Sequence, residues 1–490
     1  MKNLSYIFLM VLLISVSGCE MFNELDVENE NSPNLSQVFA DPQEYPSLLV
    51  GSYRIWWNQS IGPNPNYALS TAAEASTSGY GSWGMGDYYR VPRQPINNVN
   101  VDDPVLDPVY GSWYAYYAAL PAVNNIIKGI LEGNEVMVGN DDYTQGTLAH
   151  AYFLQGLIYG HLAITYDKAF LITENTVLEE FEYEFTEASD LLDFALSRMD
   201  QAIEICNTHS FSDPVSMLNG NTFDNASLAA FINANAARIL AASARTAADT
   251  QSIDWNRIKN YAENGITSDF TVFGEVGWVG LAISRDTNNI IHLLAWDWIR
   301  VHSRILNMMA PRDPNAPYPW PNNTMALGEI NSPDNRLNTD MEYAGQHPAW
   351  NPAVRGYHVL SMYKYTRFFE SFGRTGTGPI HFFLKAENDL LLAEALLRTG
   401  GNSPQVADLV NNTRVGRGQL TPMTGSESPE EALDKLFYER YVELSWTYPL
   451  LPYFDRRRTD DLMPGTARQL PIPAKELILN GFEVYTFGGN

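Results

Sequence analysis

Two clusters of side chains in this sequence combine aromatic and polar groups of the kinds that bind a ligand non-covalently. One lies in a glycine-rich stretch and consists of Tyr80, Trp83, Asp87, Tyr88 and Arg90. The other lies among prolines and consists of Tyr318, Trp320 and Asn322. Aromatic faces stack on flat apolar surfaces, and the charged and amide groups beside them form hydrogen bonds. We expect either that these loops present their rings to a ligand or that they bury the rings beneath themselves.

Residues used in catalysis are not arranged in a pattern that predicts an enzyme. The H-E-x-x-H, G-x-S-x-G and Walker A patterns are absent, as is the D-x-D-x-D-G loop of calcium sites. Gly79, Gly81 and Gly84 satisfy a G-x-G-x-x-G pattern, but no β-rich run precedes them and no apolar helix follows, which argues against a dinucleotide site. We therefore expect no catalysis, no cofactor and no metal. The remaining catalytic alternative is a glycoside hydrolase, which needs only two carboxylates roughly 5 to 9 Å apart.

The elements that must position these clusters are mainly helices. Apolar residues recur at i, i+3 and i+4 spacing, as in amphipathic helices, over 45–58, 107–132, 143–166, 185–207, 226–248, 254–264 and 289–309. Small residues crowd these stretches and allow close helix packing, as in stacked helix pairs of the tetratricopeptide type. We expect Trp56, Trp57, Trp113, Trp296 and Trp298, which lie in such stretches, to be core residues. Periodicity disappears between about 311 and 357, and an aperiodic stretch of this length is often functional.

After residue 381 the helices are marked by their capping residues. Gly400-Gly401 ends one helix, and Ser403 with Pro404 begins the next. Ser428 and Glu431 form a capping box at the start of a further helix, which we expect to end near Trp446. This part of the chain is therefore predicted to be a run of paired helices.

Charge and cysteine content limit the partners. The 490 residues include 31 Lys and Arg against 57 Asp and Glu, a formal charge of −26. Nucleic acids and anionic lipid surfaces attract basic patches, so neither is an expected partner. Cys19 and Cys206 are the only cysteines. Cys206 lies in an apolar periodic stretch and is predicted to be a core residue.

The N-terminus has the features of a lipoprotein signal peptide. Lys2 precedes an apolar run over 4–16 that is shorter than the roughly 20 residues of a membrane-spanning helix. The small residues Ser17 and Gly18 come directly before Cys19, which we expect to carry the lipid after residues 1–18 are removed. An ordinary signal peptide in which Cys19 is incidental is the alternative. Residues 19–36 are acidic and turn-rich and predict a flexible tether, followed by one domain over 37–490.

Several short motifs occur in a characteristic order towards the C-terminus. They are Leu391 to Ala395, Asn411 to Arg417, Glu439-Arg440 with Glu443-Leu444, Phe454 to Arg457, and Arg468 to Pro473 with Glu476 and Asn480. Ala151-Tyr152-Phe153 and Tyr166-Asp167 add a matching helical hairpin further back. With the N-terminal signal, this order resembles the SusD/RagB family of outer-membrane nutrient-binding lipoproteins of Bacteroidetes. The chain departs from the family pattern directly after Leu444 and directly after Tyr166, both in structural motifs.

The resemblance implies a fold, a location and a partner. The fold is mainly α, a tetratricopeptide-like scaffold of about four helix pairs with an irregular, loop-rich ligand-binding half. Members are lipid-anchored at the cell surface in the outer membrane, bind oligosaccharides or polysaccharides and deliver them to a SusC-type TonB-dependent transporter without catalysis. Sugar rings have apolar C–H faces and hydroxyl edges, which match the aromatic and polar residues of the two clusters. A peptide ligand in the same family is the alternative.

Overall fold

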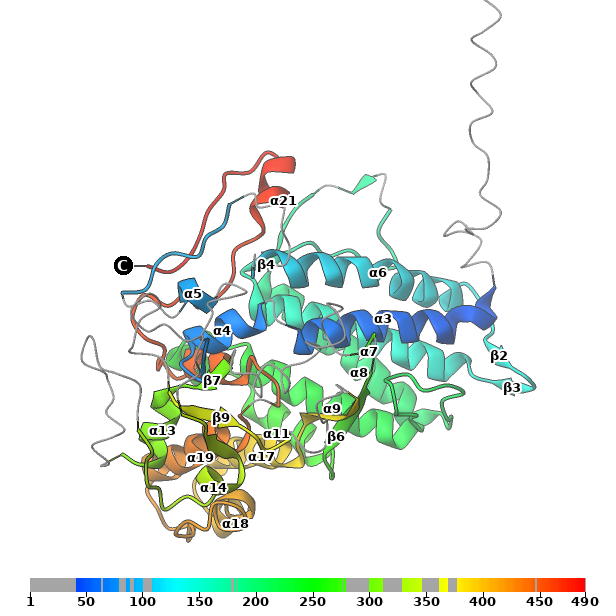
Figure 1. The fold of residues 1–490 in the computed structure, drawn as a ribbon. Helices are drawn as coiled ribbons and strands as arrows, with labels where there is room; N and C mark the ends of the chain where they lie inside the picture. Colours follow the sequence, from blue (N-terminus) through cyan, green and yellow to red (C-terminus); the bar gives the residue numbers. More distant parts are fainter. Residues whose placement is uncertain are drawn as a thin grey trace, which may run out of the picture.

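The computed structural model confirms the mainly helical fold class. It describes residues 41–62, 65–78, 85–88, 92–99, 108–177, 180–181, 183–275, 277–278, 299–311, 328–345, 361–368, 377–445 and 447–489. Figure 1 shows a group of long helices and, beside it, a region of shorter helices and short strands. No helix in these ranges has the length and hydrophobicity to span a membrane. Cys19 and the predicted tether over 19–36 lie outside the described residues.

The long helices pack around α7 (Thr144–Thr165), in which all residues but one are buried. The other helices of this group are α3 (Tyr45–Ile61), α6 (Tyr110–Leu131), α8 (Ala188–Thr208), α9 (Asn225–Ala242) and α11 (Trp255–Glu263). A Cβ atom at Gly156 would lie 2.8 Å from the carbonyl oxygen of Ala195, and one at Gly160 would lie 2.7 Å from Cδ1 of Ile239. These glycines therefore allow α8 and α9 to approach the backbone of α7, as the content of small residues predicts.

The second group of helices begins with the predicted hairpin. Its members are α17 (Lys385–Gly400), α18 (Pro404–Arg414), α19 (Pro429–Glu443), α20 (Leu451–Arg457) and α21 (Ala474–Leu479). Gly401 follows α17 with a positive φ of 80°, and Oγ of Ser403 accepts a hydrogen bond from the Val406 amide at 3.3 Å. Ser428 and Glu431 form the predicted capping box. The caps are local features, which is why the sequence predicts them correctly.

Short elements complete the described chain. The short helices are η1 (Pro42–Glu44), α4 (Asn66–Ala72), α5 (Met85–Tyr88), α10 (Ala247–Ser252), α13 (Ser303–Met309) and α14 (Arg336–Thr339). The strands form antiparallel pairs of β1 (Ser76–Ser78) with β7 (Ile299–Val301), β2 (Met137–Val138) with β3 (Asp141–Asp142), β4 (Lys168–Ala169) with β5 (Thr186–Glu187), β6 (Phe270–Gly274) with β10 (Gly378–Phe383), and β8 (Met341–Tyr343) with β9 (Tyr363–Tyr365). Each pair is too small to be stable without support from neighbouring elements.

Three predicted helix ranges differ from the structure. The range 289–309 is not one helix, because residues 299–301 form β7 and α13 begins only at Ser303, with Nδ1 of His302 accepting from the Arg304 amide at 3.1 Å; residues 289–298 lie outside the described residues. The range 226–248 is divided, because Thr246 caps a separate helix, α10. The helix expected to end near Trp446 ends at Glu443. Strand pairing and side-chain caps, which periodicity does not report, decide these boundaries.

Predicted core residues lie in the core wherever the structure describes them. Trp56, Trp57 and Trp113 are buried, and the indole Nε1 of Trp57 donates to the carbonyl of Trp278 at 2.9 Å. Trp296 and Trp298 lie outside the described residues. Cys206 is buried, and burial raises the pKa of its thiol to about 12, which makes it unreactive at neutral pH.

Arginine side chains join the two helix groups. The guanidinium of Arg457 on α20 donates to the carbonyls of Ile164 at 2.8 Å and of Ala242, which lie at the C-termini of α7 and α9. Within the first group, Arg245, which follows α9, donates to the carbonyls of Ala163 at 3.1 Å and Tyr166 at 2.6 Å at the end of α7. A cation at a helix C-terminus is favoured by the helix dipole and satisfies carbonyls that lack a partner within the helix.

Candidate functional site

Part of the first predicted ligand cluster lies on α5. Asp87 is exposed, Tyr88 is half-buried and Met85 is fully buried beneath them. Arg93 attaches this short helix to α4, because its guanidinium donates to the carbonyls of Tyr88 and of Ala72, the latter at 3.1 Å. The other predicted ligand residues lie outside the described residues; they are Tyr80, Trp83, Arg90, Tyr318, Trp320 and Asn322. Ligand contact by all eight residues stays a prediction.

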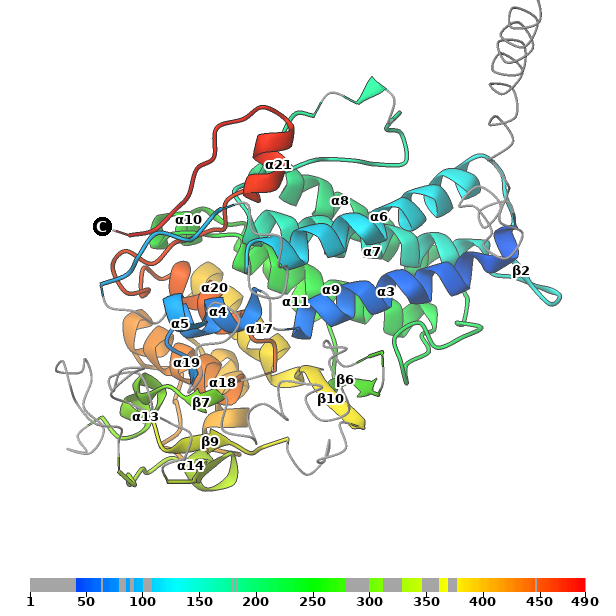
Figure 2. The same ribbon diagram turned by 45° about the horizontal axis from the view of Figure 1, so that its top comes forward.

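The strands β1, β7, β9 and β8 form what we call the strand frame. Ser78 of β1 lies opposite Ile299 of β7, and Tyr343 of β8 lies opposite Tyr363 of β9. Oγ of Ser361 donates to the carbonyl of Val301 at 2.5 Å, which joins the two pairs through β7 and β9. Figures 1 and 2 show β7 and β9 side by side.

The strand frame anchors both predicted ligand-binding segments. The chain that carries the first cluster leaves β1 at Ser78, directly opposite the residue at which β7 begins. The second aperiodic segment contains β8 and is followed by β9. The hydroxyl of Tyr363 accepts a hydrogen bond from the Ile330 amide at 2.8 Å, which fixes the described start of this segment to β9. Two segments more than 200 positions apart in sequence therefore share one support.

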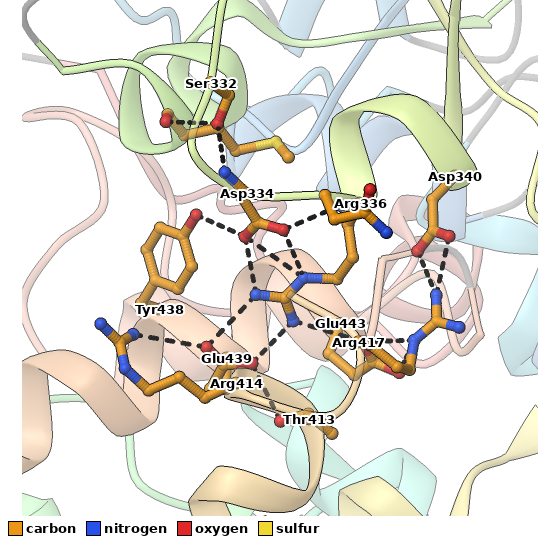
Figure 3. Close-up of polar contacts among 12 residues, drawn as sticks. Ser332, Asp334, Arg336, Asp340, Thr413, Arg414, Arg417, Tyr438, Glu439 and Glu443 are labelled. Atoms are coloured by element: carbon orange, nitrogen blue, oxygen red, sulfur yellow. Dashed lines mark hydrogen bonds and ion pairs between the residues drawn. The ribbon is translucent and has the colours of Figure 1, made fainter. Parts of the chain in front are cut away.

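A buried ion network, centred on Arg336 of α14, holds the frame to the helices (Figure 3). The Arg336 side chain has no exposed surface, and its guanidinium lies 2.7 Å from Oδ2 of Asp334, 2.6 Å from Oε2 of Glu439 and 3.3 Å from Oε2 of Glu443. Burial by itself would raise the pKa of Asp334, but hydrogen bonds from Arg336 and Tyr438 and the charge of Arg336 lower it. This carboxyl is therefore ionised at neutral pH.

Within this network, Glu443 of α19 is the carboxylate with the most arginine partners. Besides Arg336, it accepts from Arg367 after β9 at 2.7 Å and from Arg417 after α18 at 2.9 Å. Asp340 lies 2.5 Å from the same Arg417 guanidinium and 4.0 Å from that of Arg367. The network pairs four cations with four anions, which are Arg336, Arg367, Arg414 and Arg417 with Asp334, Asp340, Glu439 and Glu443. The equal numbers of positive and negative groups allow the network to be buried, because each charge lies beside at least one charge of opposite sign.

A second buried carboxylate, Glu74, fixes the start of β1. Its backbone has a positive φ of 57°, and its Oε2 lies 2.6 Å from the Arg304 guanidinium and 3.4 Å from that of Arg456. Burial by itself would raise the pKa of this carboxyl, whereas the neighbouring His302, Arg456 and Arg304 lower it to about 2. The turn between α4 and β1 is therefore tied to α13 and α20.

A histidine–aspartate pair is buried at α7. His150 and Asp213 form a pair with Nε2 to Oδ1 at 2.9 Å, the arrangement that general-base chemistry uses, but neither side chain has exposed surface. Nδ1 of the same imidazole is 2.8 Å from the Tyr53 hydroxyl, so the group is enclosed on both sides. Among the described residues, no group of three or more His, Cys, Asp or Glu side chains is placed to hold a metal ion.

Comparison with solved structures identifies the fold. No protein-family model matches the chain, and no curated protein matches it in sequence. A SusD superfamily protein from Bacteroides thetaiotaomicron superposes with a TM-score of 0.61 at 16% identity, covering 91% of this chain and 100% of that one. A SusD-like carbohydrate binding protein from Bacteroides vulgatus gives 0.56 at 14%, covering 85% and 83%. The chain has the SusD fold. A laminarin binding SusD-like protein gives 0.56 at 14%, covering 91% and 99%.

Within the SusD fold, the motifs behind the sequence resemblance form buried ion pairs. Glu394 accepts from both terminal nitrogens of Arg458 at 2.6 Å, and Arg440 lies 2.8 Å from Oδ2 of Asp455. The motifs contain Glu439, Glu443 and Arg417, but they do not predict the partners of these residues. Those partners are Arg336 and Asp340 at α14 and Arg367 after β9, and Arg336 in turn binds Asp334. Their only sequence signal is that they are charged, three of them in an aperiodic stretch, which is weak.

The Glu443→Ala variant tests the ion network. Removing this carboxylate takes one anionic partner from each of three arginines and leaves Arg336, which has no exposed surface, in excess positive charge, so we expect a loss of about 3 to 5 kcal/mol in the free energy of unfolding. Amide hydrogen exchange at β8 and β9 should accelerate, because the link from these strands to α19 is cut. The control is Glu263→Ala, whose half-exposed partner Lys259 lies 3.8 Å away, with an expected cost below about 1 kcal/mol. Equal costs for the two variants would refute the central role of Glu443.

The Glu74→Gln variant should change the pH dependence of stability. The folded-state pKa of about 2 lies below the ordinary value of 4.5, so the ionised carboxylate stabilises the folded protein. This contribution, on the order of 3 kcal/mol, is complete above about pH 4.5 and is lost as the pH falls towards 2. Urea unfolding of both proteins should therefore give a large difference at pH 7 that shrinks at pH 3. A difference that does not depend on pH would contradict the assigned ion pairs.

Proposed function

We propose that this protein is a cell-surface lipoprotein that binds an oligosaccharide or polysaccharide and delivers it to a SusC-type TonB-dependent transporter without reacting with it. The strand frame carries the proposal. It gives the two aromatic-rich segments a common support, with Ser78 of the first beside β7 and Ile330 of the second bonded to β9. Aromatic residues of both segments would then contact the same ligand.

The chemistry of the two segments suits a sugar. Tyr80 and Trp83 offer rings for the apolar faces of a pyranose, and Asp87 and Arg90 offer hydrogen bonds to its hydroxyls. The names of two structures that share the fold, a carbohydrate binding protein and a laminarin binding protein, support the same ligand class. The ion network around Arg336 would keep the support rigid, so that less conformational entropy is lost on binding.

The N-terminus supplies the proposed location. A diacyl or triacyl group on Cys19 would hold the protein stably on the outer membrane, since each buried CH₂ contributes about 0.8 kcal/mol. The tether over 19–36 would keep the domain close to its transporter while letting it move.

Removal of the aromatic rings tests the ligand site. We expect Trp83→Ala and Trp320→Ala to abolish retardation of the protein in gels that contain its glycan, because each loses a stacking platform worth about 1 kcal/mol or more in addition to its buried area. Circular dichroism should be unchanged. Tyr183→Ala is the control, because this exposed ring packs on Phe170, away from the strand frame, and should leave retardation intact.

The alternatives are separate outcomes of the same experiment. Unchanged retardation of both tryptophan variants in the glycan gel would refute the proposed ligand site. Binding of peptides instead of glycans would assign the alternative ligand class. Turnover of any glycan by the purified protein would refute the proposal that it does not catalyse a reaction.

Replacement of the lipidated residue tests the location. Cys19→Ser should release a folded protein that still binds its glycan in solution but no longer supports uptake by the cell. Fractionation of cells followed by the gel assay measures both properties. Retention of the variant in the membrane would show that Cys19 does not carry the anchor.

A further inference from the structure

Exposed apolar side chains gather where the described chain ends. Within seven positions on and after α21, four large apolar side chains are between 39% and 70% exposed, with Leu479 the most exposed. These four are Ile478, Leu479, Phe482 and Val484. Figures 1 and 2 show α21 at the edge of the molecule. Single exposed apolar residues are common on proteins, but a contiguous group of them marks an interaction surface.

Two neighbouring segments extend this surface. Pro95 pairs with Gly488 in an isolated antiparallel bridge, and the Ile96 amide donates to the Phe487 carbonyl at 2.8 Å. The exposed Val99 follows on the segment that is paired in this way. On the other side, the Phe185 ring lies 5.0 Å from that of Phe482. Phe185 stacks on Phe170 at 4.5 Å, and the exposed Tyr183 packs on the same Phe170 at 5.8 Å. We call the surface formed by Val99, Tyr183, Ile478, Leu479, Phe482 and Val484 the C-terminal apolar patch.

The patch is held in place from beneath. The amide of Asn98 donates to the carbonyls of Ile472 at 2.9 Å and Tyr485 at 2.8 Å. The Tyr485 hydroxyl donates to Asp167 at 2.7 Å, and Leu477 is on the buried face of α21. These contacts fix the exposed side chains before any partner arrives, which lowers the entropy cost of docking.

The charges beside the patch indicate what covers it. Glu180, Glu184 and Glu483 are exposed beside Tyr183 and Phe482. Of the nearby cations, Lys168 is paired with Glu187 at 2.6 Å, and the ammonium of Lys475 on α21 lies 6.0 Å from the centre of the Tyr110 ring. An acidic border repels an anionic lipid surface, and it would face an identical acidic border in a second copy of the chain. We propose that the C-terminal apolar patch docks a different protein, whose contact surface is apolar and bordered by Lys and Arg. This inference goes beyond glycan binding and does not depend on it.

Site-specific photocrosslinking in the cells that make the full-length protein tests the proposal. The photoreactive amino acid p-benzoylphenylalanine replaces Phe482 in one strain and Val415 in a control strain. Val415 is similarly exposed, at 40%, but follows α18, away from the patch. We expect one discrete heteromeric product from position 482 and none from position 415, with the crosslinked peptide containing apolar residues next to Lys or Arg.

Other outcomes overturn the proposal. These are a product of twice the mass of the chain, an adduct with lipid only, equal products from both positions, or no product. A second arm places the photoreactive group at Tyr183 and adds Leu479→Glu, which should reduce the yield about tenfold because a charge replaces a central apolar contact. An unchanged yield would also overturn the proposal. The crosslinked protein could have the expected apolar surface bordered by Lys and Arg without being a β-barrel transporter. That result would support docking at the patch and contradict the delivery step of the proposed function.

Discussion

The structure depends on the burial of arginines together with the carboxylates that neutralise them. Removing a charge from water costs several kcal/mol, and only close, well-oriented partners compensate for it. Arg336 illustrates the requirement, because its guanidinium contacts Asp334, Glu439 and Glu443 with no exposed surface. Such a group is directional, so it fixes the relative position of the elements that supply its members in a way that apolar packing alone does not.

This directionality explains why the ion network lies where it does. The helices around α7 have a continuous apolar core, and glycines at 156 and 160 let them pack closely. The strands of the frame are only three residues long and bury little apolar surface by themselves. Glu443 and Glu74 connect these short strands to α19, α13 and α20. The helical scaffold therefore supplies the rigidity that strands of this length lack by themselves.

The strand frame and the C-terminal apolar patch lie apart in the molecule. Figures 1 and 2 show α21, the helix that carries Ile478 and Leu479 of the patch, on the side opposite α14 and β9. A protein docked on the patch would not cover the strand frame. Ligand capture and protein docking could then take place together, as delivery of a bound ligand to a second protein requires.

Features that depend on neighbours a few residues apart can be predicted from the amino-acid order. Helical periodicity and the caps at Gly401, Ser403 and Ser428 give α6 to α8, the start of α9 and α17 to α19 within a few residues, and buried tryptophans such as Trp113 follow from the same pattern. The motifs containing Glu439 and Arg440 also indicated the SusD fold, although they did not reveal what these residues bind.

Contacts between residues far apart in the sequence follow from the tertiary fold alone. β1 pairs with β7 more than 200 positions away, and Arg336 reaches Glu439 across 103 positions. Strands of three residues carry too little periodicity to be recognised, so residues 289–309 were predicted as one helix although β7 lies within them. Local pattern predicts local hydrogen bonds, whereas strand pairing and buried ion pairs depend on the position of a partner that the local sequence does not specify.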